Sequence, residues 1–508
     1  MNANLYGLLH DHFAEHAEQP CLLIPGGPVI HYDDLDSTSA RIAHALLAAG
    51  CKIGDRVAVQ VDKSWEALAL YLASLRAGLV YLPLNTGYQV SENANELPYF
   101  FDDADPAVIV CRNDTLDAIT SLRPHAAVMT LHGDSGSLLG QAADKSEVFD
   151  TVHSRPGDLA AILYTSGTTG RSKGAMLTHR NLGSNALTLV EQWGFTRGDV
   201  LLHSLPIYHV HGLFVACHCV MLCGGRMLWL PKFDAKTVIA HLPQATVMMG
   251  VPTFYTRLLA EPDFGPEVCK TIRLFVSGSA PLLPDTFKAF KARTGHVILE
   301  RYGMTETGMN TSNPLVEERI AGTVGPPLPG VSVRIVGPEG APCAAGVVGA
   351  IEVKGPNVFV GYWRMPEKTG EEFTADGYFR TGDLGEMLPN GYLRIVGRAK
   401  DMIISGGLNV YPKEIEEKID SLSGVCESAV IGVPDADLGE AVTAIVVPEP
   451  GTSPSEAEII STLKSEIAAF KVPKRVHFVD DLPRNAMGKI EKSVLRRRYS
   501  AENQDVSR

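Results

Sequence analysis

Residues 164–174 read Tyr-Thr-Ser-Gly-Thr-Thr-Gly-Arg-Ser-Lys-Gly, and they follow an apolar run over residues 159–163 that is typical of a buried strand. A segment so rich in glycine and hydroxyl side chains packs poorly into a core but suits a loop around an anion. Glycine lets backbone N–H groups approach a phosphate closely, and the hydroxyls and Lys173 add donors and charge. The spacing is not Gly-x4-Gly-Lys-Ser/Thr, which excludes a Walker-type P-loop. We interpret the stretch as a phosphate-binding loop of another kind.

Length and charge narrow the class of protein further. The chain has 508 residues, more than one hydrophobic core usually serves, so we expect two or more domains. Its hydrophobic content of 45% and charged content of 20% are those of an ordinary globular enzyme. The net charge of −13 repels polyanions and argues against nucleic-acid binding. A phosphate site must therefore be built from local Lys, Arg and backbone donors.

Cysteine usage and hydropathy indicate the compartment. Nine cysteines are scattered without a spacing that suggests disulfides, which is typical of a reducing environment. The first twenty residues include acidic side chains and no apolar h-region, so we predict no signal peptide. The longest apolar stretch, residues 213–223, is interrupted by His218 and is too short to span a bilayer. We expect a soluble cytoplasmic protein without a membrane partner.

Strand-like and helix-like segments alternate through the first three hundred residues. Predicted strands include 56–61, 159–164, 274–277 and 297–299, and residues 65–77 are predicted as a helix. This alternation predicts an α/β fold with parallel sheets and helical crossovers. From about residue 322, short strands separated by Gly/Pro turns predict a small antiparallel sheet or barrel.

A second boundary is expected near residues 398–401, where a compact α+β segment of about a hundred residues begins. We therefore predict an N-terminal domain over residues 1–399, which binds the small molecules, and a C-terminal domain over residues 400–508.

Residues 301–306, Arg-Tyr-Gly-Met-Thr-Glu, lie just past the predicted strand 297–299, where ligands collect in α/β sheets. Tyr302 could stack on a flat base, and Thr305 could donate a hydrogen bond to a phosphate. Glu306 is a hard oxygen ligand for a phosphate-bound Mg²⁺. An ordinary polar loop at a strand end is the alternative interpretation.

Two weaker motifs follow. In Thr381-Gly382-Asp383 a carboxylate on a glycine turn could accept hydrogen bonds from both hydroxyls of a ribose, and Arg398 could reach the same nucleotide. Residues 483–489, Pro-Arg-Asn-Ala-Met-Gly-Lys, place Lys489 beside a glycine near the C-terminus. Its point charge could offset the negative charge that develops when a carboxylate attacks a phosphate. Each motif alone is weak evidence.

The four motifs together, in this order and at these spacings, resemble the adenylate-forming superfamily, which includes acyl-CoA synthetases, firefly luciferase and the adenylation domains of peptide synthetases. The resemblance covers nearly the whole chain. It implies a large N-terminal domain of two α/β subdomains plus a small β-barrel, and a mobile α+β C-terminal domain that carries a catalytic lysine. It also implies two steps: a carboxylate attacks the α-phosphate of Mg²⁺-ATP, and a thiol, here that of coenzyme A, then displaces AMP.

The resemblance also implies a role for each matching residue. The β- and γ-phosphates of ATP would be held by Thr165, Ser166, Gly167, Thr168, Thr169, Gly170 and Lys173. Other contacts to ATP would come from Ser279, Ala280, Tyr302 at adenine, Thr305 at the α-phosphate, and Asp383 and Arg398 at the ribose. Glu306 and Thr165 would hold Mg²⁺, and Lys489, Glu306 and Thr305 would act in catalysis.

The moving domain has expected residues of its own. Lys400 would be the hinge, and Gly406 and Gly407 would line the CoA tunnel. In some bacterial relatives the lysine that matches Lys489 is acetylated, so a lysine acetyltransferase and deacetylase are candidate partners.

The acid pocket carries an unusual charge. Arg301 stands directly before Tyr302, where small residues are common in relatives, and His209, His211, Ser279 and Met309 are expected beside it. An arginine that faces a buried pocket needs an anion, and its planar fork matches a carboxylate in two-point contact. The second carboxylate of a short dicarboxylic acid would supply that anion.

Residues 206–213, 251–255 and 300–312 are similar to those of malonyl-CoA synthetases. We therefore predict ATP-dependent ligation of malonate to CoA, which yields malonyl-CoA, AMP and pyrophosphate. The alternative is a CoA ligase for methylmalonate, oxalate or a short monocarboxylic acid.

Several other interpretations stay open at this point. Arg301 could pair with Glu300 on the surface. His209, His211, Cys217, His218, Cys219 and Cys223 have the side-chain types of a zinc site, although residues 212–223 are apolar enough for a buried helix. A luciferase-like oxygenase, a non-catalytic nucleotide-binding protein and a carrier-protein thiol acceptor are the remaining functional alternatives.

Overall fold

The computed structural model describes residues 2–88, 96–122, 125–165, 172–406, 408–435, 438–484 and 489–505, with side chains as far as residue 500. Contacts between Cα atoms group the chain into two units. The first comprises Met1–Val333 and Val353–Phe379, and the second comprises Arg334–Glu352 and Arg380–Arg508. Within the described ranges, no helix combines the length and the apolar character needed to cross a bilayer.

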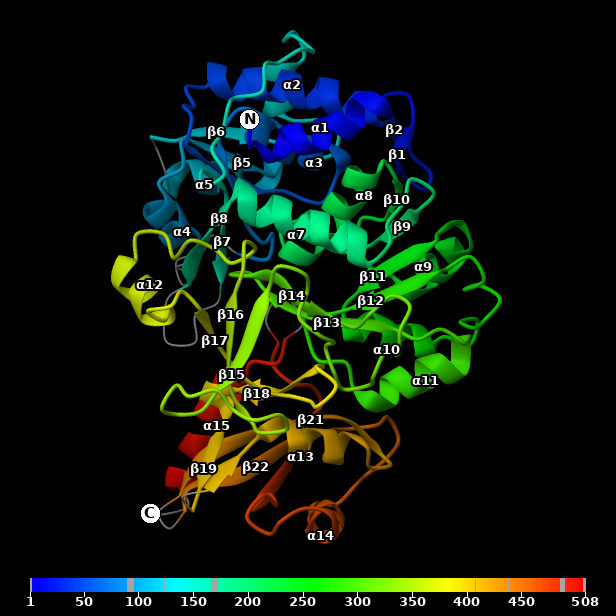
Figure 1. Cartoon of the computed structure of the whole chain (residues 1–508), viewed down its shortest axis with the longest axis vertical. Coiled ribbons are helices and arrows are strands. Elements are labelled where there is room, and N and C mark those ends of the chain that lie inside the picture. Colours follow the sequence, from blue (N-terminus) through cyan, green and yellow to red (C-terminus); the bar gives the residue numbers. More distant parts are fainter. Residues whose placement is uncertain are drawn as a thin grey trace. The chain divides into compact units, whose positions relative to one another are not determined.

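The first unit contains a six-stranded sheet, in which β7 and β8 are the strands that border the predicted phosphate loop (Figure 1). Its strands are β3 (Arg56–Gln60), β4 (Val80–Pro83), β5 (Val108–Cys111), β6 (Ala127–Thr130), β7 (Leu159–Thr165) and β8 (Lys173–Thr178). They lie in the order β6-β5-β3-β4-β7-β8. Neighbours are parallel except in the β7–β8 hairpin, which is antiparallel.

An eight-stranded sheet forms the second layer of strands in the first unit. Its strands are β1 (Pro20–Leu23), β2 (Val29–His31), β9 (Val200–His203), β10 (Arg226–Trp229), β11 (Val247–Gly250), β12 (Leu274–Ser277), β13 (Leu299–Met304) and β14 (Gly308–Ser312). Their order is β14-β13-β12-β11-β9-β10-β1-β2. The inner neighbours are parallel, and only the outermost pairs β1–β2 and β13–β14 are antiparallel. The predicted parallel α/β fold is confirmed.

Helices connect and cover these sheets. They are α1 (Leu5–Glu15), α2 (Tyr32–Ala48), α3 (Trp65–Arg76), α4 (Glu96–Ala104), α5 (Leu116–Leu122), α6 (Ser137–Ala142), α7 (His179–Gln192), α8 (His218–Cys223), α9 (Ala235–His241), α10 (Pro252–Ala260), α11 (Pro284–Thr294) and α12 (Pro366–Glu372). Helix α7 contacts both β8 and β14, so it joins the two sheets. It starts with a capping box in which Thr178 and Asn181 satisfy each other's backbone N–H groups.

A π-helix, η2 (His211–Cys217), runs directly into α8. All seven of its residues are buried, which confirms the buried helix predicted over residues 212–223. The π winding was not predicted. Because residue 212 is glycine, the backbone of η2 can pass close to Pro206. A Cβ at position 212 would lie 2.0 Å from the carbonyl oxygen of Pro206. Wide turns of this kind are rare and cluster at functional sites.

The second unit contains most of a four-stranded sheet and a compact α+β segment. The four strands are β15 (Ser332–Val336), β16 (Gly349–Lys354), β17 (Phe379–Met387) and β18 (Leu393–Arg398), in that order across the sheet. The α+β segment comprises η4 (Ala399–Asp401), β19 (Ile403–Ser405), β20 (Leu408–Val410), α13 (Pro412–Asp420), β21 (Val425–Asp435), β22 (Gly439–Pro448), α14 (Glu456–Glu466), β23 (Arg475–Phe478) and α15 (Lys492–Asp505). Separate apolar clusters pack around its β21–β22 ribbon.

Two local expectations need correction. Residues 301–304 were expected in a loop after a strand over 297–299, but β13 runs from Leu299 to Met304 and pairs with β14 beyond it. Asp383 was expected on a turn, but it lies inside β17, where Gly382 has a φ of +72°. In both places a partner strand distant in sequence extends the ladder, which local propensity does not reveal.

Candidate active site

The predicted phosphate loop begins and ends on the β7–β8 hairpin. Thr165 and Lys173 are directly opposite each other in the register, so the two ends of the loop lie side by side. The Thr165 hydroxyl donates to the carbonyl oxygen of Lys173 at 3.4 Å. Ser166, Gly167, Thr168, Thr169 and Gly170 lie outside the described residues, and their predicted role stays a prediction.

Glu306 lies beside this hairpin. Its Oε1 accepts from the Thr165 hydroxyl at 3.5 Å and from the Tyr362 hydroxyl at 3.1 Å, and the residue is buried. The fold thus brings together the two residues predicted to hold Mg²⁺, although 141 positions separate them. A carboxylate and a hydroxyl oxygen are donors that Mg²⁺ accepts, so the residues present fit a phosphate-bound Mg²⁺. Sequence reasoning missed Tyr362, because nothing near it resembles a motif.

Lys173 is held by the same aromatic residue. Its Nζ lies 4.1 Å from the centroid of the Tyr362 ring and 3.6 Å from Oε1 of Glu372. The cation–π contact and the long ion pair hold the ammonium beside Tyr362, whose hydroxyl donates to Glu306. Thr165, Lys173, Glu306 and Tyr362 therefore form one polar cluster, as a triphosphate site requires.

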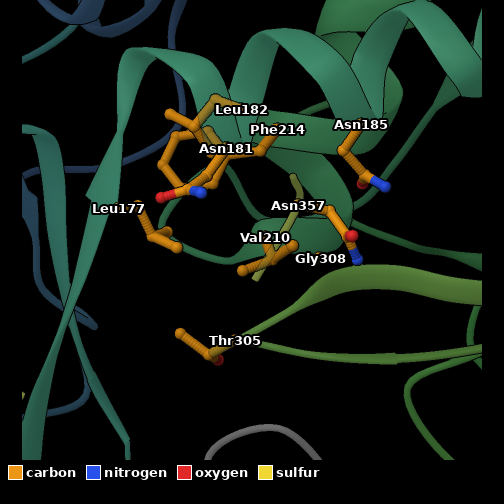
Figure 2. Close-up of a pocket in the computed structure, with 9 residues that line it drawn as sticks. All are labelled: Leu177, Asn181, Leu182, Asn185, Val210, Phe214, Thr305, Gly308 and Asn357. Atoms are coloured by element: carbon orange, nitrogen blue, oxygen red, sulfur yellow. The ribbon is translucent and has the colours of Figure 1, made fainter. Parts of the chain in front are cut away.

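A small cavity lies next to this cluster, between α7 and the β13–β14 hairpin (Figure 2). It is lined by Leu177, Asn181, Leu182, Asn185, Val210, Phe214, Thr305, Gly308 and Asn357. Its volume of about 10 Å³ accommodates about one water molecule. Asn185 closes one side, because its side chain accepts from the N–H of Met309 at 3.0 Å and donates to the Met309 carbonyl at 3.0 Å. Buried Met309 is thereby fixed at the backbone.

Arg301 lies on β13 and is 3% exposed. Its Nε and Nη2 are buried without a hydrogen-bond acceptor, and no acidic side chain in the described ranges forms an ion pair with it. The guanidinium lies against Gly278, where a Cβ would come within 2.4 Å of its Cζ. Burial lowers the pKa of Arg301 to about 10, so the group remains charged at neutral pH. This buried fork of donors lacks an anion.

The alternative interpretation, in which Arg301 pairs with Glu300, is not seen in the described structure. Successive side chains of a strand point to opposite faces, so the two residues face apart. Glu300 Oε1 accepts from the backbone N–H of Leu282 at 3.0 Å.

Two histidines surround the same space. His211 Nδ1 lies 3.3 Å from the Ser279 hydroxyl, and the Nε2 atoms of His209 and His211 have no partner. Burial lowers the pKa of His209 to about 4, and burial followed by the positive charge of Arg301 lowers the pKa of His211 well below its usual range. Both rings are therefore neutral at pH 7 and keep an N–H to donate.

Ser279 and Ala280 follow β12 at its carboxyl end. Ser279 has a φ of +72°, which is uncommon outside glycine and marks sites under functional constraint. The structure thus brings His209, His211, Ser279 and Arg301 together, as predicted, although their roles are not thereby tested. Tyr302 is buried at 8% exposure and pairs with Thr311 across β13–β14.

The second unit carries its own cluster of predicted residues. Asp383 and Arg398 face each other across β17–β18, and Arg398 Nε lies 2.7 Å from Asp383 Oδ1. The surrounding protein lowers the pKa of Lys489; the positive charge of Arg398 lowers it further, whereas Asp383 opposes the shift. Burial also lowers the pKa of Lys400. Gly406 has a φ of +57°, and Gly407 lies outside the described residues.

The cysteine- and histidine-rich segment is packed as core. His218 Nε2 and the Tyr71 hydroxyl are 2.8 Å apart, and Cys217 Sγ lies 3.4 Å from Nε2 of His203. Within the described ranges, no group of three or more His, Cys, Asp or Glu side chains has the arrangement of a metal site.

These observations define an enzyme that binds a nucleotide and an acid, and the comparisons with known proteins agree. The family model of AMP-binding enzymes matches residues 9–363, and that of the AMP-binding enzyme C-terminal domain matches residues 414–489. The chain belongs to the AMP-binding enzyme family, the adenylate-forming enzymes that the sequence motifs resemble.

The chain is also similar to individual members of this family. The chain is 37% identical to a mouse protein named malonate–CoA ligase ACSF3, mitochondrial, over 88% of this chain and 82% of that protein. It is 36% identical to a feruloyl-CoA synthase of Amycolatopsis sp., over 93% of this chain and 95% of that protein. The crystal structure of ATP-bound MatB from Rhodopseudomonas palustris matches with a TM-score of 0.96 and 55% identity, over 98% of this chain and 99% of that one.

Proposed function

We propose that this protein is a malonate–CoA ligase that forms AMP. It joins malonate to coenzyme A at the expense of ATP, through a malonyl-adenylate intermediate. The observation that carries the choice of acid is the buried guanidinium of Arg301, whose Nε and Nη2 lack acceptors in the described structure. A planar carboxylate satisfies both donors at once.

The relatives support this choice from two directions. Mouse and Arabidopsis thaliana relatives carry the name malonate–CoA ligase, and the Amycolatopsis relative carries the name feruloyl-CoA synthase. An aryl monocarboxylic acid would leave the charge of Arg301 unpaired, because its only carboxylate is the reacting group. The second carboxylate of a short diacid supplies the missing partner.

In the first step an oxygen of one malonate carboxylate attacks the α-phosphorus of ATP. The bond from that phosphorus to its bridging oxygen breaks, and pyrophosphate leaves. We assign Arg301, with donors from His209 and His211, to the distal carboxylate, which orients the other carboxylate for attack. Lys173 and the ends of the loop are assigned to the departing phosphates. In the second step the sulfur of CoA attacks the acyl carbon, the thiol loses its proton, and AMP leaves.

Bound with ATP, Mg²⁺ would supply positive charge against the phosphates. Glu306 and Thr165 are the residues that would hold it. Lys489 is assigned to the developing negative charge of the first step, where one well-placed donor is worth about 3 kcal/mol. Asp383 and Arg398 are assigned to the ribose, with Tyr302 at the adenine and Thr305 at the α-phosphate.

Domain movement belongs to the same proposal. We place the moving C-terminal domain at residues 400–508, with its hinge at Lys400 and its CoA-facing glycines at 406 and 407. A lysine acetyltransferase that neutralises Lys489 would stop the first step while CoA binding continues. We also propose that the protein is located in the cytoplasm.

A panel of acids tests the function directly. Pyrophosphate release and CoA thioester formation are measured with Mg²⁺-ATP and CoA for malonate, methylmalonate, oxalate, succinate, acetate, butyrate, ferulate and a long fatty acid. We expect turnover confined to malonate and its close analogues. Turnover led by a monocarboxylic acid would contradict the assignment of Arg301, and the absence of turnover with every acid would contradict the ligase itself.

A further inference from the structure

Lys63 connects the two sheets of the first unit. It lies in the loop between β3 and α3, and its side chain reaches the carboxyl ends of β9 and β10 in the other sheet. There its Nζ is 2.8 Å from Nδ1 of His203, 2.8 Å from the His203 carbonyl oxygen and 2.7 Å from the Leu230 carbonyl oxygen. The ring of Trp229 lies 4.1 Å from Nζ. No carboxylate in the described structure pairs with this ammonium, so it balances no acidic residue.

The hydrogen bonds of His203 define its tautomer. His203 is buried, and its Nε2 lies 2.9 Å from the carbonyl oxygen of Gly212 and 3.4 Å from Cys217 Sγ. Because a carbonyl oxygen only accepts, Nε2 must carry the proton. In the neutral ring Nδ1 is then an acceptor, and Lys63 must donate to it.

The same bonds indicate that Lys63 is an ammonium. Three acceptors require three N–H donors, and only the charged form of lysine has three. Burial lowers the pKa of Lys63, but three acceptors and an aromatic face favour the charge at this point. A neutral amine would leave one of the three acceptors without a donor.

The hydrogen bonds that start at Lys63 run through His203 and end at the carbonyl oxygen of Gly212. Gly212 is the second residue of η2, and it directly follows His211 and closely follows His209. Its close approach to Pro206 leaves this turn little freedom. The bond from His203 to the Gly212 carbonyl therefore fixes the backbone from which the two pocket histidines project.

We propose that Lys63 is a positioning residue for acid recognition: it fixes the tautomer of His203, which holds the Gly212 carbonyl and so places His209 and His211 around the distal carboxylate. This inference rests on the proposed function for the identity of the acid. It adds two residues, Lys63 and His203, that lie outside the family motifs quoted above.

Replacing the lysine tests the proposal. Lys63→Met keeps the length of the side chain and removes its donors. We expect the KM for malonate to rise at least tenfold while the KM for ATP changes less than twofold. Lys236→Met is the matched control, because it removes the same charge from an exposed position on α9. Equal losses for malonate and ATP, or an unchanged KM for malonate, would overturn the proposal.

A pair of amides at position 203 separates positioning from general stability. In His203→Gln the amide N–H₂ lies near the place of Nε2 and can still donate to Gly212, whereas in His203→Asn it lies near Nδ1 and cannot. We expect the Gln variant to keep the KM for malonate within about threefold of the parent value, and the Asn variant to behave like Lys63→Met. Equal kinetics of the two variants would contradict the role of the Gly212 bond.

Nitrogen NMR of the unaltered protein tests the tautomer directly and needs no substrate. With ¹⁵N-labelled histidine, we expect His203 to show a protonated Nε2 and a bare Nδ1, assigned by the signal lost in His203→Gln. The opposite tautomer would overturn the inference even if malonate is the substrate. Failure of the wild-type protein to turn over malonate would overturn the proposed function. The NMR measurement would still show whether Lys63, His203 and Gly212 are hydrogen-bonded as described.

Discussion

Two arginines that lie near opposite ends of strand β12 have opposite surroundings. Arg273 directly precedes β12, and it donates to Asp199 Oδ1 at 2.7 Å, to Asp199 Oδ2 at 2.8 Å and to the carbonyl oxygens of Trp193 and Gly194 at 3.0 Å. Arg301 is the third residue of β13, beside the carboxyl end of β12, and its Nε and Nη2 are buried without acceptors. The protein thus supplies hydrogen-bond acceptors for the guanidinium of Arg273 but not for Nε and Nη2 of Arg301.

The difference shows how a structural arginine can be told from a ligand-binding one. A protein gains nothing in stability from a buried charge without a partner, and the penalty amounts to several kcal/mol. A buried charge without a protein partner is therefore expected where a bound ligand supplies that partner. Arg273 is therefore expected to contribute to the stability of the fold, and Arg301 to contribute only when an acid is bound.

The largest expected effect is on catalysis by an Arg301→Ala variant. Removing one partner of a buried ion pair costs roughly 3–5 kcal/mol, so kcat/KM for malonate should fall by about two to four decades. The KM for ATP should change little, since the loop ends and Glu306 are untouched. Steady-state kinetics with malonate and butyrate measure this. Equal losses for the two acids would break the comparison, because the arginine would then be structural.

The counterpart is an Arg273→Met variant, which we expect to lose stability rather than specificity. The variant leaves the Asp199 carboxylate buried without its fork of donors, at a cost of about 3 kcal/mol in the free energy of unfolding. Differential scanning calorimetry should show a lower Tm, and the KM for malonate should stay unchanged at temperatures where the variant is folded. A rise in that KM without a change in Tm would contradict the assignment.

A smaller effect of opposite sign is expected from Arg301→Met, which fills most of the space and removes the charge. Because the charge has no partner without ligand, the free energy of unfolding should rise by about 1 kcal/mol or more in the absence of acid. Calorimetry with saturating malonate supplies the control, since malonate should raise the Tm of the wild type and leave that of the variant unchanged. A variant less stable than the wild type in ligand-free buffer would indicate a hidden partner for Arg301.

The smallest expected effect is on pH dependence. Burial alone would raise the pKa of Asp199, but hydrogen bonds from Arg273, Thr196 and Thr246 outweigh it and lower that pKa. A carboxyl with a lowered folded pKa stabilises the fold above its unfolded pKa of about 3.9, and this contribution disappears as the pH falls through the folded pKa. The difference in stability between wild type and Arg273→Met should be complete above about pH 5 and should narrow below about pH 4. Chemical denaturation at several pH values measures it, and a constant difference would contradict the role of the ion pair.

The sequence predicted the strands that periodicity alone can define. The apolar segment 274–277 is β12 with the same bounds, and the helix expected over 65–77 is α3, one residue shorter. The order of glycine-rich, Tyr-Gly-Met-Thr-Glu and lysine motifs was sufficient to indicate the family. Arg301 was also identified, because a charged residue stands where an apolar pocket wall was expected.

The remainder depends on contacts between distant segments. Lys63 stands in the polar run Asp62-Lys63-Ser64, which is typical of an exposed loop, and its acceptors lie 140 and 167 positions away. Tyr362 was missed for the same reason, since its bond to Glu306 spans 56 positions. The π winding of η2 was also missed, because its sequence His-Gly-Leu-Phe-Val-Ala-Cys suits an α-helix equally well. These features follow from tertiary packing, which periodicity does not encode.

The π-helix has a consequence for how acid preference can change between descendants of one gene. A π turn contains one residue more than an α turn, so η2 behaves as a one-residue insertion ahead of α8. Deleting one residue from His211–Cys217 would let the segment rewind as an α-helix and would turn the chain before it by about 100° around the axis. A deletion placed after His211 would then redirect His209 while every pocket side chain is kept. A single codon deletion could thus remodel the acid pocket more thoroughly than a point substitution.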